Sequence, residues 1–281
     1  MQSTPRSTRI VRSLMLICGA IGVLLTIGFY WQLPWITNLW PWTDSHLSYV
    51  WLASICAAVS APIIWIALSG EYGAAVGGSI NLLVTATSIT ISLLLFYRSS
   101  YQQTPISLIL YFAIGIPIFA GISWWASRYP IRDTRPMPRL VFISFIVFVL
   151  LLVFTTLALL LRMPTIFPWA LLPESSVLFG CFFLGAACYF AYGLIRPSWH
   201  NACGQLLGFL AYDLILIVPF IEHFATVSIN HLLSLVIYVA VIIYSGALAI
   251  YYLFVKKTTR LWGTAPGQEK STSSYSALNQ S

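Results

Sequence analysis

Residues 13–31, SLMLICGAIGVLLTIGFYW, contain no charged side chain, and this stretch decides the fold. A helix of about 20 mostly apolar residues is long enough to cross the hydrocarbon core of a bilayer. Arg6, Arg9 and Arg12 precede the run, as basic residues precede the core of a signal peptide. The run is too long for such a core and no small-x-small cleavage site follows it, so we expect an uncleaved membrane-spanning helix.

The composition of the whole chain also indicates a membrane protein. Of the 281 residues, 59% are hydrophobic and 7% are charged, whereas soluble domains carry about 25% charged residues. So few charges cannot cover a water-exposed surface, and we expect the lipid bilayer to surround the protein. The net charge of +7 gathers at the two ends and in one central loop. Nucleic-acid binding is not expected, because it requires a basic stripe along one face.

Eight segments are long and apolar enough to span a membrane. They are roughly residues 12–31, 47–69, 73–97, 105–126, 139–161, 176–195, 203–221 and 231–255. The five cysteines lie in or beside these segments without a CxxC pair, so we expect small buried side chains rather than disulfides. The predicted fold class is all-α, a polytopic membrane helix bundle with eight transmembrane helices.

Lysine and arginine determine the predicted orientation, because short cytoplasmic loops carry most of these residues. If the N-terminus lies inside, the outer loops hold only Arg98 and Arg162. The inner segments hold the other twelve, which are Arg6, Arg9, Arg12, Arg128, Arg132, Arg135, Arg139, Arg196, Lys256, Lys257, Arg260 and Lys270. This split predicts a multi-pass protein of the plasma (inner) membrane with both termini in the cytoplasm.

The first outer loop, LPWITNLWPWTDSH at residues 33–46, is rich in tryptophan. An indole ring favours the headgroup layer, where its body is in apolar surroundings and its N–H can meet water. The remaining tryptophans also fall near predicted helix ends. We therefore interpret the tryptophans as membrane anchors, and an aromatic box that binds a ligand is the alternative.

The basic loop near residue 130 divides the predicted helices into two sets of four. Trp40-Pro41-Trp42 precedes the second helix, and Phe167-Pro168-Trp169 precedes the sixth. A polar patch and a helix with a small-residue stretch follow each motif, which favours a duplication. An even number of helices in each half would make the repeats parallel. We predict a first repeat at 1–127, a basic cytoplasmic linker at 128–138, a second repeat at 139–255 and a disordered cytoplasmic tail at 256–281.

This loop and the helix after it, LWPWTDSHLSYVWLASICAAVSAPIIWIALSGE at residues 39–71, resemble a group of uncharacterised bacterial multi-pass membrane proteins. The second copy departs from the motif, because Phe167 stands in the place of the first tryptophan. The resemblance implies a bacterial inner-membrane protein. It brings no established activity and no site residues.

Asp213, in LLGFLAYDLILIVPF, is the one acidic residue deep inside a predicted helix. A charged group at that depth costs about 2.5–3.5 kcal/mol on insertion scales. It should face the bundle, either as a proton or cation site or as a helix-packing hydrogen bond. Aligning the third helix of each half sets Asn81 opposite Asp213, and Thr85 and Ser88 follow Asn81 on one helical face. We predict a substrate or ion pathway at Asp213, Asn81, Thr85 and Ser88.

Three histidines, His46, His223 and His231, fall at the predicted outer face and are weak candidates for metal ligands beside Asp44 and Glu222. Their spacing matches no metal motif such as HExxH, so we expect neither a metal nor a cofactor. A haem is not expected either, because no pair of buried histidines could hold it. GxGxxG, P-loop and GxSxG motifs do not occur, and an enzyme is therefore the least supported class.

Two functions from different classes remain open. The first is a small-solute or ion transporter with its site at Asn81 and Asp213. The second is a structural or accessory subunit that binds a membrane-protein partner, or a second copy of the chain, through its tryptophan-rich loops and small-residue helix faces. A water-filled cavity at Asp213 favours transport, and a dry, closely packed Asp213 favours the subunit.

The orientation can be tested with reporter fusions. A reporter joined after Arg98 should report the outer compartment and one joined after Arg139 the cytoplasm, because the Lys and Arg residues divide so unevenly. Alkaline phosphatase and green fluorescent protein fusions provide the measurement. The same compartment for both sites would contradict the eight-helix topology.

Overall fold

The computed structural model describes residues 6–42, 45–99 and 106–261. Eight long helices occur in these ranges: α1 (Arg6–Tyr30), α3 (His46–Ser69), α4 (Ala75–Ser99), α5 (Ile106–Ala126), α6 (Arg139–Leu160), α7 (Pro173–Ile195), α8 (Trp199–His223) and α9 (Ile229–Ile250). All eight are long and apolar enough to cross a bilayer. The predicted all-α membrane bundle is confirmed.

Smaller elements at the helix ends differ from the prediction. A short helix, α2 (Pro34–Thr37), interrupts the tryptophan-rich loop, and a 3₁₀ turn, Tyr72–Ala74, precedes α4. Proline is tolerated in the first turn of a helix, and α7 accordingly begins at Pro173, three residues before the predicted start. The last helix ends in a π-helical turn, Tyr251–Val255.

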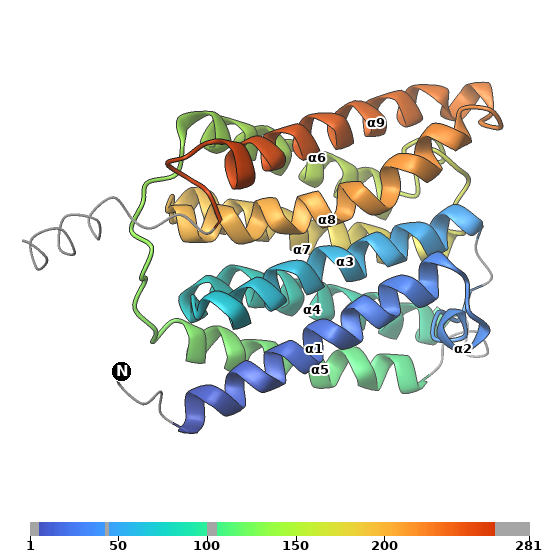
Figure 1. Ribbon diagram of the computed structural model, residues 1–281. Coiled ribbons are helices and arrows are strands. Elements are labelled where there is room, and N and C mark those ends of the chain that lie inside the picture. The colour runs from blue at the N-terminus through green and yellow to red at the C-terminus, as the bar shows by residue number, and fades with distance from the viewer. Residues whose placement is uncertain (1–5, 43–44, 100–105, 262–281) are drawn as a thin grey trace, which may run out of the picture.

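The helices form two layers of four (Figure 1). One layer runs in the order α1, α3, α8, α9, and the other in the order α5, α4, α7, α6. Each helix packs closely on its neighbours within a layer, whereas the contacts of α3 with α4 and of α7 with α8, which link the layers, are sparse. The two layers are therefore joined mainly through side chains.

The two ends of the bundle differ in chemistry. We call the end with residues 31–42 and 161–172 the aromatic end, and the end with residues 127–138 and 256–261 the basic end. The start of α1 and the end of α9 both lie at the basic end, as an even number of spans requires (Figure 1). Which end faces the cytoplasm stays a prediction.

The segment predicted as a linker, 128–138, is fastened to its surroundings. Arg135 forms an ion pair of 2.6 Å with Asp133 and donates from its guanidinium to the carbonyl of Thr258 at 3.0 Å. Trp199 N–H, at the start of α8, donates to the carbonyl of Arg135 at 2.8 Å. Residues 256–261 thus pack against the basic loop, and the remainder of the predicted tail lies outside the described residues.

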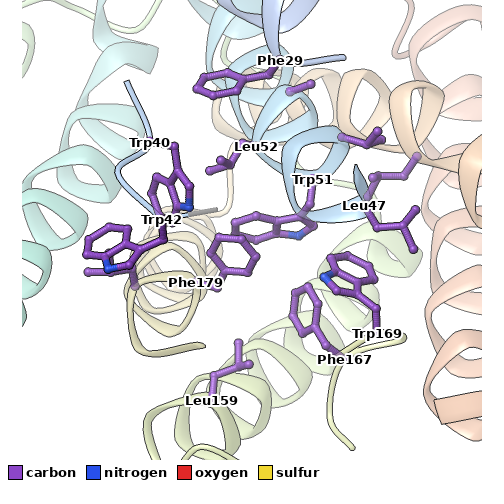
Figure 2. Packing of buried hydrophobic residues seen from close by; sticks show 14 of the residues in the cluster. Phe29, Trp40, Trp42, Leu47, Trp51, Leu52, Leu159, Phe167, Trp169 and Phe179 are labelled. Carbon is purple, nitrogen blue, oxygen red and sulfur yellow. The ribbon is translucent and has the colours of Figure 1, made fainter. Parts of the chain in front are cut away.

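The aromatic end holds a cluster of buried rings that the sequence analysis did not foresee (Figure 2). The Trp51 ring, with 0% of its surface exposed, stacks on Phe179 of the other layer with ring centroids 4.0 Å apart. Phe167 lies edge-on to Trp51 at 5.8 Å, and Trp40 lies 5.8 Å from Phe179. Aromatic pairs at such distances contribute roughly 0.5–1.5 kcal/mol beyond burial. The cluster joins the two layers at this end.

These contacts correct the anchor interpretation for part of the loop. Trp40, Trp42 and Trp169 are buried, and Trp169 Nε1 donates to the buried Ser48 hydroxyl at 2.9 Å. The loops fold back over the bundle, so these rings meet other rings rather than headgroups. Trp31 and Trp35 are exposed, and the interpretation as anchors stays a prediction for them.

Glycines permit the close approach of helices within each layer. A Cβ atom at Gly208 of α8 would lie 2.9 Å from the backbone oxygen of Ala58 in α3. A Cβ atom at Gly77 of α4 would lie 2.8 Å from the Tyr189 ring in α7. Helix faces built from small residues allow such packing where lipid supplies no hydrophobic force between helices.

The helix contacts follow an order that a duplication would produce. The first helix of each predicted repeat packs on the second, since α1 contacts α3 and α6 contacts α7. The second helix of each packs on the third helix of the other, since α3 contacts α8 and α7 contacts α4. The division into repeats at 1–127 and 139–255 stays a prediction. The matching contacts of the second and third helices across the two halves support it.

Two glycine substitutions separate packing from helix propensity. Gly208→Ala should lower the stability of the protein, because overpacking against backbone costs about 1–3 kcal/mol and exceeds the gain in propensity. Gly121→Ala should leave stability equal or higher, because a Cβ atom there meets nothing within 4 Å and helix propensity improves by about 1 kcal/mol. Thermal unfolding in detergent measures both, and equal midpoints would contradict the close contact of α3 with α8.

The aromatic cluster makes a second prediction about stability. Trp51→Ala should destabilise the bundle by about 3 kcal/mol or more, because a fully buried indole leaves a cavity. Trp31→Ala serves as the matched control, since 70% of the Trp31 surface is exposed and such changes cost about 0.5 kcal/mol or less. The difference between the two thermal midpoints is the measurement. A similar loss of stability in both variants would contradict the burial of Trp51 in the core.

Candidate functional site

A cavity of about 880 Å³ lies between the two layers. All eight long helices contribute to its lining, which is mostly apolar. The polar side chains that line it, outside the indoles, are Ser79, Asn81, Thr85, Thr155, Tyr189, Gln205, Tyr212, Asp213, Tyr238 and Ser245. A mostly apolar pocket of this size with a few converging polar groups is typical of a small-molecule site.

Asp213 lies near the middle of α8, lines the cavity and is 5% exposed. The Ser245 hydroxyl of α9 is 2.8 Å from Asp213 Oδ2. The same hydroxyl is 2.7 Å from the carbonyl of Val241, so it has an acceptor with or without the carboxylate. Within the described ranges, Asp213 has no ion pair, and the basic side chains lie toward the ends of the helices. The carboxyl group is therefore buried without a cation beside it.

The residues before Asp213 give the site an aromatic wall. Tyr212 accepts a hydrogen bond of 3.0 Å from Trp51 Nε1 of α3, which connects the site to the aromatic end. Phe209 lies one helical turn before Asp213 and therefore on the same side of α8. Phe209 stacks on Phe190 with centroids 4.5 Å apart and meets Phe148 edge-on at 4.8 Å. All of these rings line the cavity.

Asn81 and Thr85 line the same cavity from the other layer. Thr85 donates from its hydroxyl to Asn81 Oδ1 at 3.3 Å, and both side chains face Gly185 of α7. The aligned repeats suggest a bond between Asn81 and Asp213, made directly or through a water. No direct bond occurs among the described contacts, and Asp213 accepts a hydrogen bond from Ser245. The two polar groups share one cavity without touching.

Ser88, the fourth residue of the predicted pathway, does not line the cavity. Its hydroxyl lies 2.8 Å from the carbonyl of Val84 and 3.1 Å from that of Thr85. In this way a serine hydroxyl in a membrane helix bonds to a carbonyl oxygen of the preceding turn of its own helix. The polar face of α4 therefore reaches the cavity at Asn81 and Thr85 but not at Ser88.

The three histidines at the aromatic end contact residues of the loops. His223 Nε2 is 3.1 Å from the carbonyl of Pro168, and His231 Nδ1 is 2.7 Å from the carbonyl of Phe167. His46 contacts the side chain of Gln32. No group of three or more metal-binding side chains occurs in the described ranges, and Asp44 lies outside them. His223 and His231 hold the loop at 161–172 onto the ends of α8 and α9.

Sequence reasoning missed several residues of the site. Ser245, Tyr212, Phe209 and Trp51 were not singled out for the site, although Tyr212 and Phe209 lie one and four positions before Asp213. Gln205, two turns before Asp213, donates to the carbonyl of Tyr189 at 2.6 Å, and its Oε1 atom is buried without a partner. The helical spacing from Asp213 could have identified the members on α8, but not those on α3 and α9.

Comparison with known proteins adds no family. A scan against protein-family models finds no match, and searches of curated proteins and of solved structures find none either. The resemblance to bacterial multi-pass membrane proteins therefore receives no support, and any function must be argued from the site.

Proposed function

We propose that this polytopic membrane protein transports a small solute, which binds in the cavity between the two layers. The observation that carries the proposal is the cavity itself, because it reaches the buried carboxyl of Asp213 from one layer and Asn81 from the other. A transport site near the middle of the membrane, between two sets of helices, suits alternating access by rocking of one set against the other.

The arrangement of contacts supports movement between the layers. Close backbone contacts are numerous within each layer and few between the layers, which are joined mainly by side chains such as Phe209 of α8 and Phe190 of α7. A layer can therefore shift as a unit and keep its own contacts, while the side chains between the layers rearrange. An accessory subunit requires no cavity of this size at its centre, so the cavity favours transport over that alternative.

The lining also indicates what kind of solute fits. Ca²⁺ and Mg²⁺ usually take six or more oxygen ligands, and the side chains that line the cavity are mainly aromatic and aliphatic. A solute with an apolar body and at least one polar group matches the lining better. We therefore favour an organic solute over an inorganic ion.

A plug in the cavity tests the proposal. Gly78 lines the cavity, and a Cβ atom there would meet nothing within 4 Å, so Gly78→Phe should fill space without disturbing packing. The matched control is Leu95→Phe on the same helix, since 62% of the Leu95 surface is exposed and this residue does not line the cavity.

The measurement has two stages. A panel of small organic solutes is first screened for thermal stabilisation of the protein in nanodiscs, and the solutes that bind are tested for uptake into proteoliposomes. Gly78→Phe should reduce binding and uptake by about tenfold or more, whereas Leu95→Phe should leave both unchanged. Binding that Gly78→Phe does not affect would place the site elsewhere, and binding without uptake would favour the accessory-subunit alternative.

A further inference from the structure

We propose that the solute is a lipophilic organic cation, whose positive charge pairs with Asp213 while its apolar body lies against the rings of the cavity. This inference rests on the proposed transport function and names the substrate class. Three features of the described residues support it: an uncompensated carboxyl group, an aromatic wall in the same cavity, and the edge of the cavity between α1 and α5.

The charge is the first feature. No lysine or arginine lines the cavity, and Ser245 is the one hydrogen-bond partner of the Asp213 side chain among the described residues. A carboxyl group in such surroundings keeps its proton unless a cation or further donors accompany the charged form. An anionic solute would be repelled from the charged form, and a neutral solute would not compensate it. A cationic solute can take the place of the proton and pair with the carboxylate.

The aromatic wall is the second feature. Phe209, one turn before Asp213, packs with Phe190 and Phe148 in the lining of the same cavity, and Tyr212 and Trp51 continue the lining toward the aromatic end. The ring faces of Phe, Tyr and Trp attract cations by about 0.5–2 kcal/mol each, depending on desolvation. The Tyr238 hydroxyl, also in the cavity lining, is buried without a hydrogen-bond partner among the described residues and can accept a hydrogen bond from an ammonium group. Rings that share a cavity with one carboxylate form a site for a cation with an apolar body.

The edge between α1 and α5 is the third feature. Leu14 of α1 and Ile118 of α5 line the cavity and are 56% and 52% exposed. The opposite edge is tied by a hydrogen bond of 2.7 Å between Ser144 of α6 and Tyr244 of α9. No corresponding bond joins α1 to α5 in the ranges that the structure describes, and the backbones of these two helices make few close contacts. We infer that a molecule dissolved in the bilayer enters at this edge, and lipophilic cations partition into that phase.

Binding of tetraphenylphosphonium tests the inference, with triphenylphosphine oxide as its neutral analogue. Both are measured by equilibrium dialysis against wild-type protein in nanodiscs, with empty nanodiscs subtracted. The wild type should bind the cation, and Asp213→Asn should weaken that binding by about tenfold or more. Binding of the neutral analogue should be weaker and should not change in the variant.

Two variants keep the result interpretable. Glu222→Gln removes the same charge from an exposed position at the end of α8 and should leave cation binding unchanged. Asp213→Glu retains the charge and should restore binding to within a few-fold of the wild type, which separates the charge from the fold. A loss of binding in Asp213→Asn without rescue by Asp213→Glu would contradict the inference.

Other outcomes separate this inference from the proposed function. Failure of the wild type to bind the cation, or equal binding by wild type and Asp213→Asn, would overturn the inference. If neutral solutes still bind in a manner that Gly78→Phe abolishes, the transport proposal survives that failure. If no solute is sensitive to Gly78→Phe, both proposals fall together.

Discussion

The stack of Trp51 on Phe179 is the contact on which the rest of the arrangement depends. Its rings come from opposite layers, with centroids 4.0 Å apart, where the backbones of the two layers otherwise touch little. In a bilayer the helices gain little by hiding apolar surface from one another, so packing and hydrogen bonds must hold the layers together. The aromatic cluster supplies that packing at one end, the rings of Phe148, Phe190 and Phe209 supply it farther along the bundle, and the cavity lies between the layers.

Trp51 also connects this structural contact to the cavity. Its ring packs in the cluster, while its Nε1 atom donates to Tyr212, the neighbour of Asp213 in α8. A relative movement of the layers would change the Trp51–Phe179 stack and the wall of the cavity together. In the proposed transport cycle, a change in the shape of the cavity would therefore be coupled to the aromatic end through Trp51.

The sequence predicted most of the architecture because the bilayer imposes strict rules. Every backbone polar group in hydrocarbon must be paired within a helix, so length and apolarity were sufficient to locate all eight spans. The position of Asp213 in the bundle followed from the cost of exposing it to lipid. Neither rule depends on knowing which helix packs on which.

The misses arose where tertiary contacts decide. An indole is equally suited to a headgroup layer and to a folded-back loop, so composition could not reveal that Trp40 and Trp169 are buried. Ser245 was invisible as a partner of Asp213, because serine is common in membrane helices and usually bonds to its own backbone. Asn81 lines the same cavity as Asp213, yet the alignment of repeats could not show that α9 supplies the hydrogen bond to Asp213.

The contacts of Asp213 bear on why a carboxyl group stands there at all. Ser245 has the carbonyl of Val241 as a second acceptor, so the helix pair α8–α9 does not need the carboxylate to satisfy that hydroxyl. An apolar side chain of similar size would avoid the cost of burying a charge, and replacing buried charges by apolar groups is often neutral or stabilising. Packing therefore gives no reason for an acid at position 213, whereas the proposed cationic solute would.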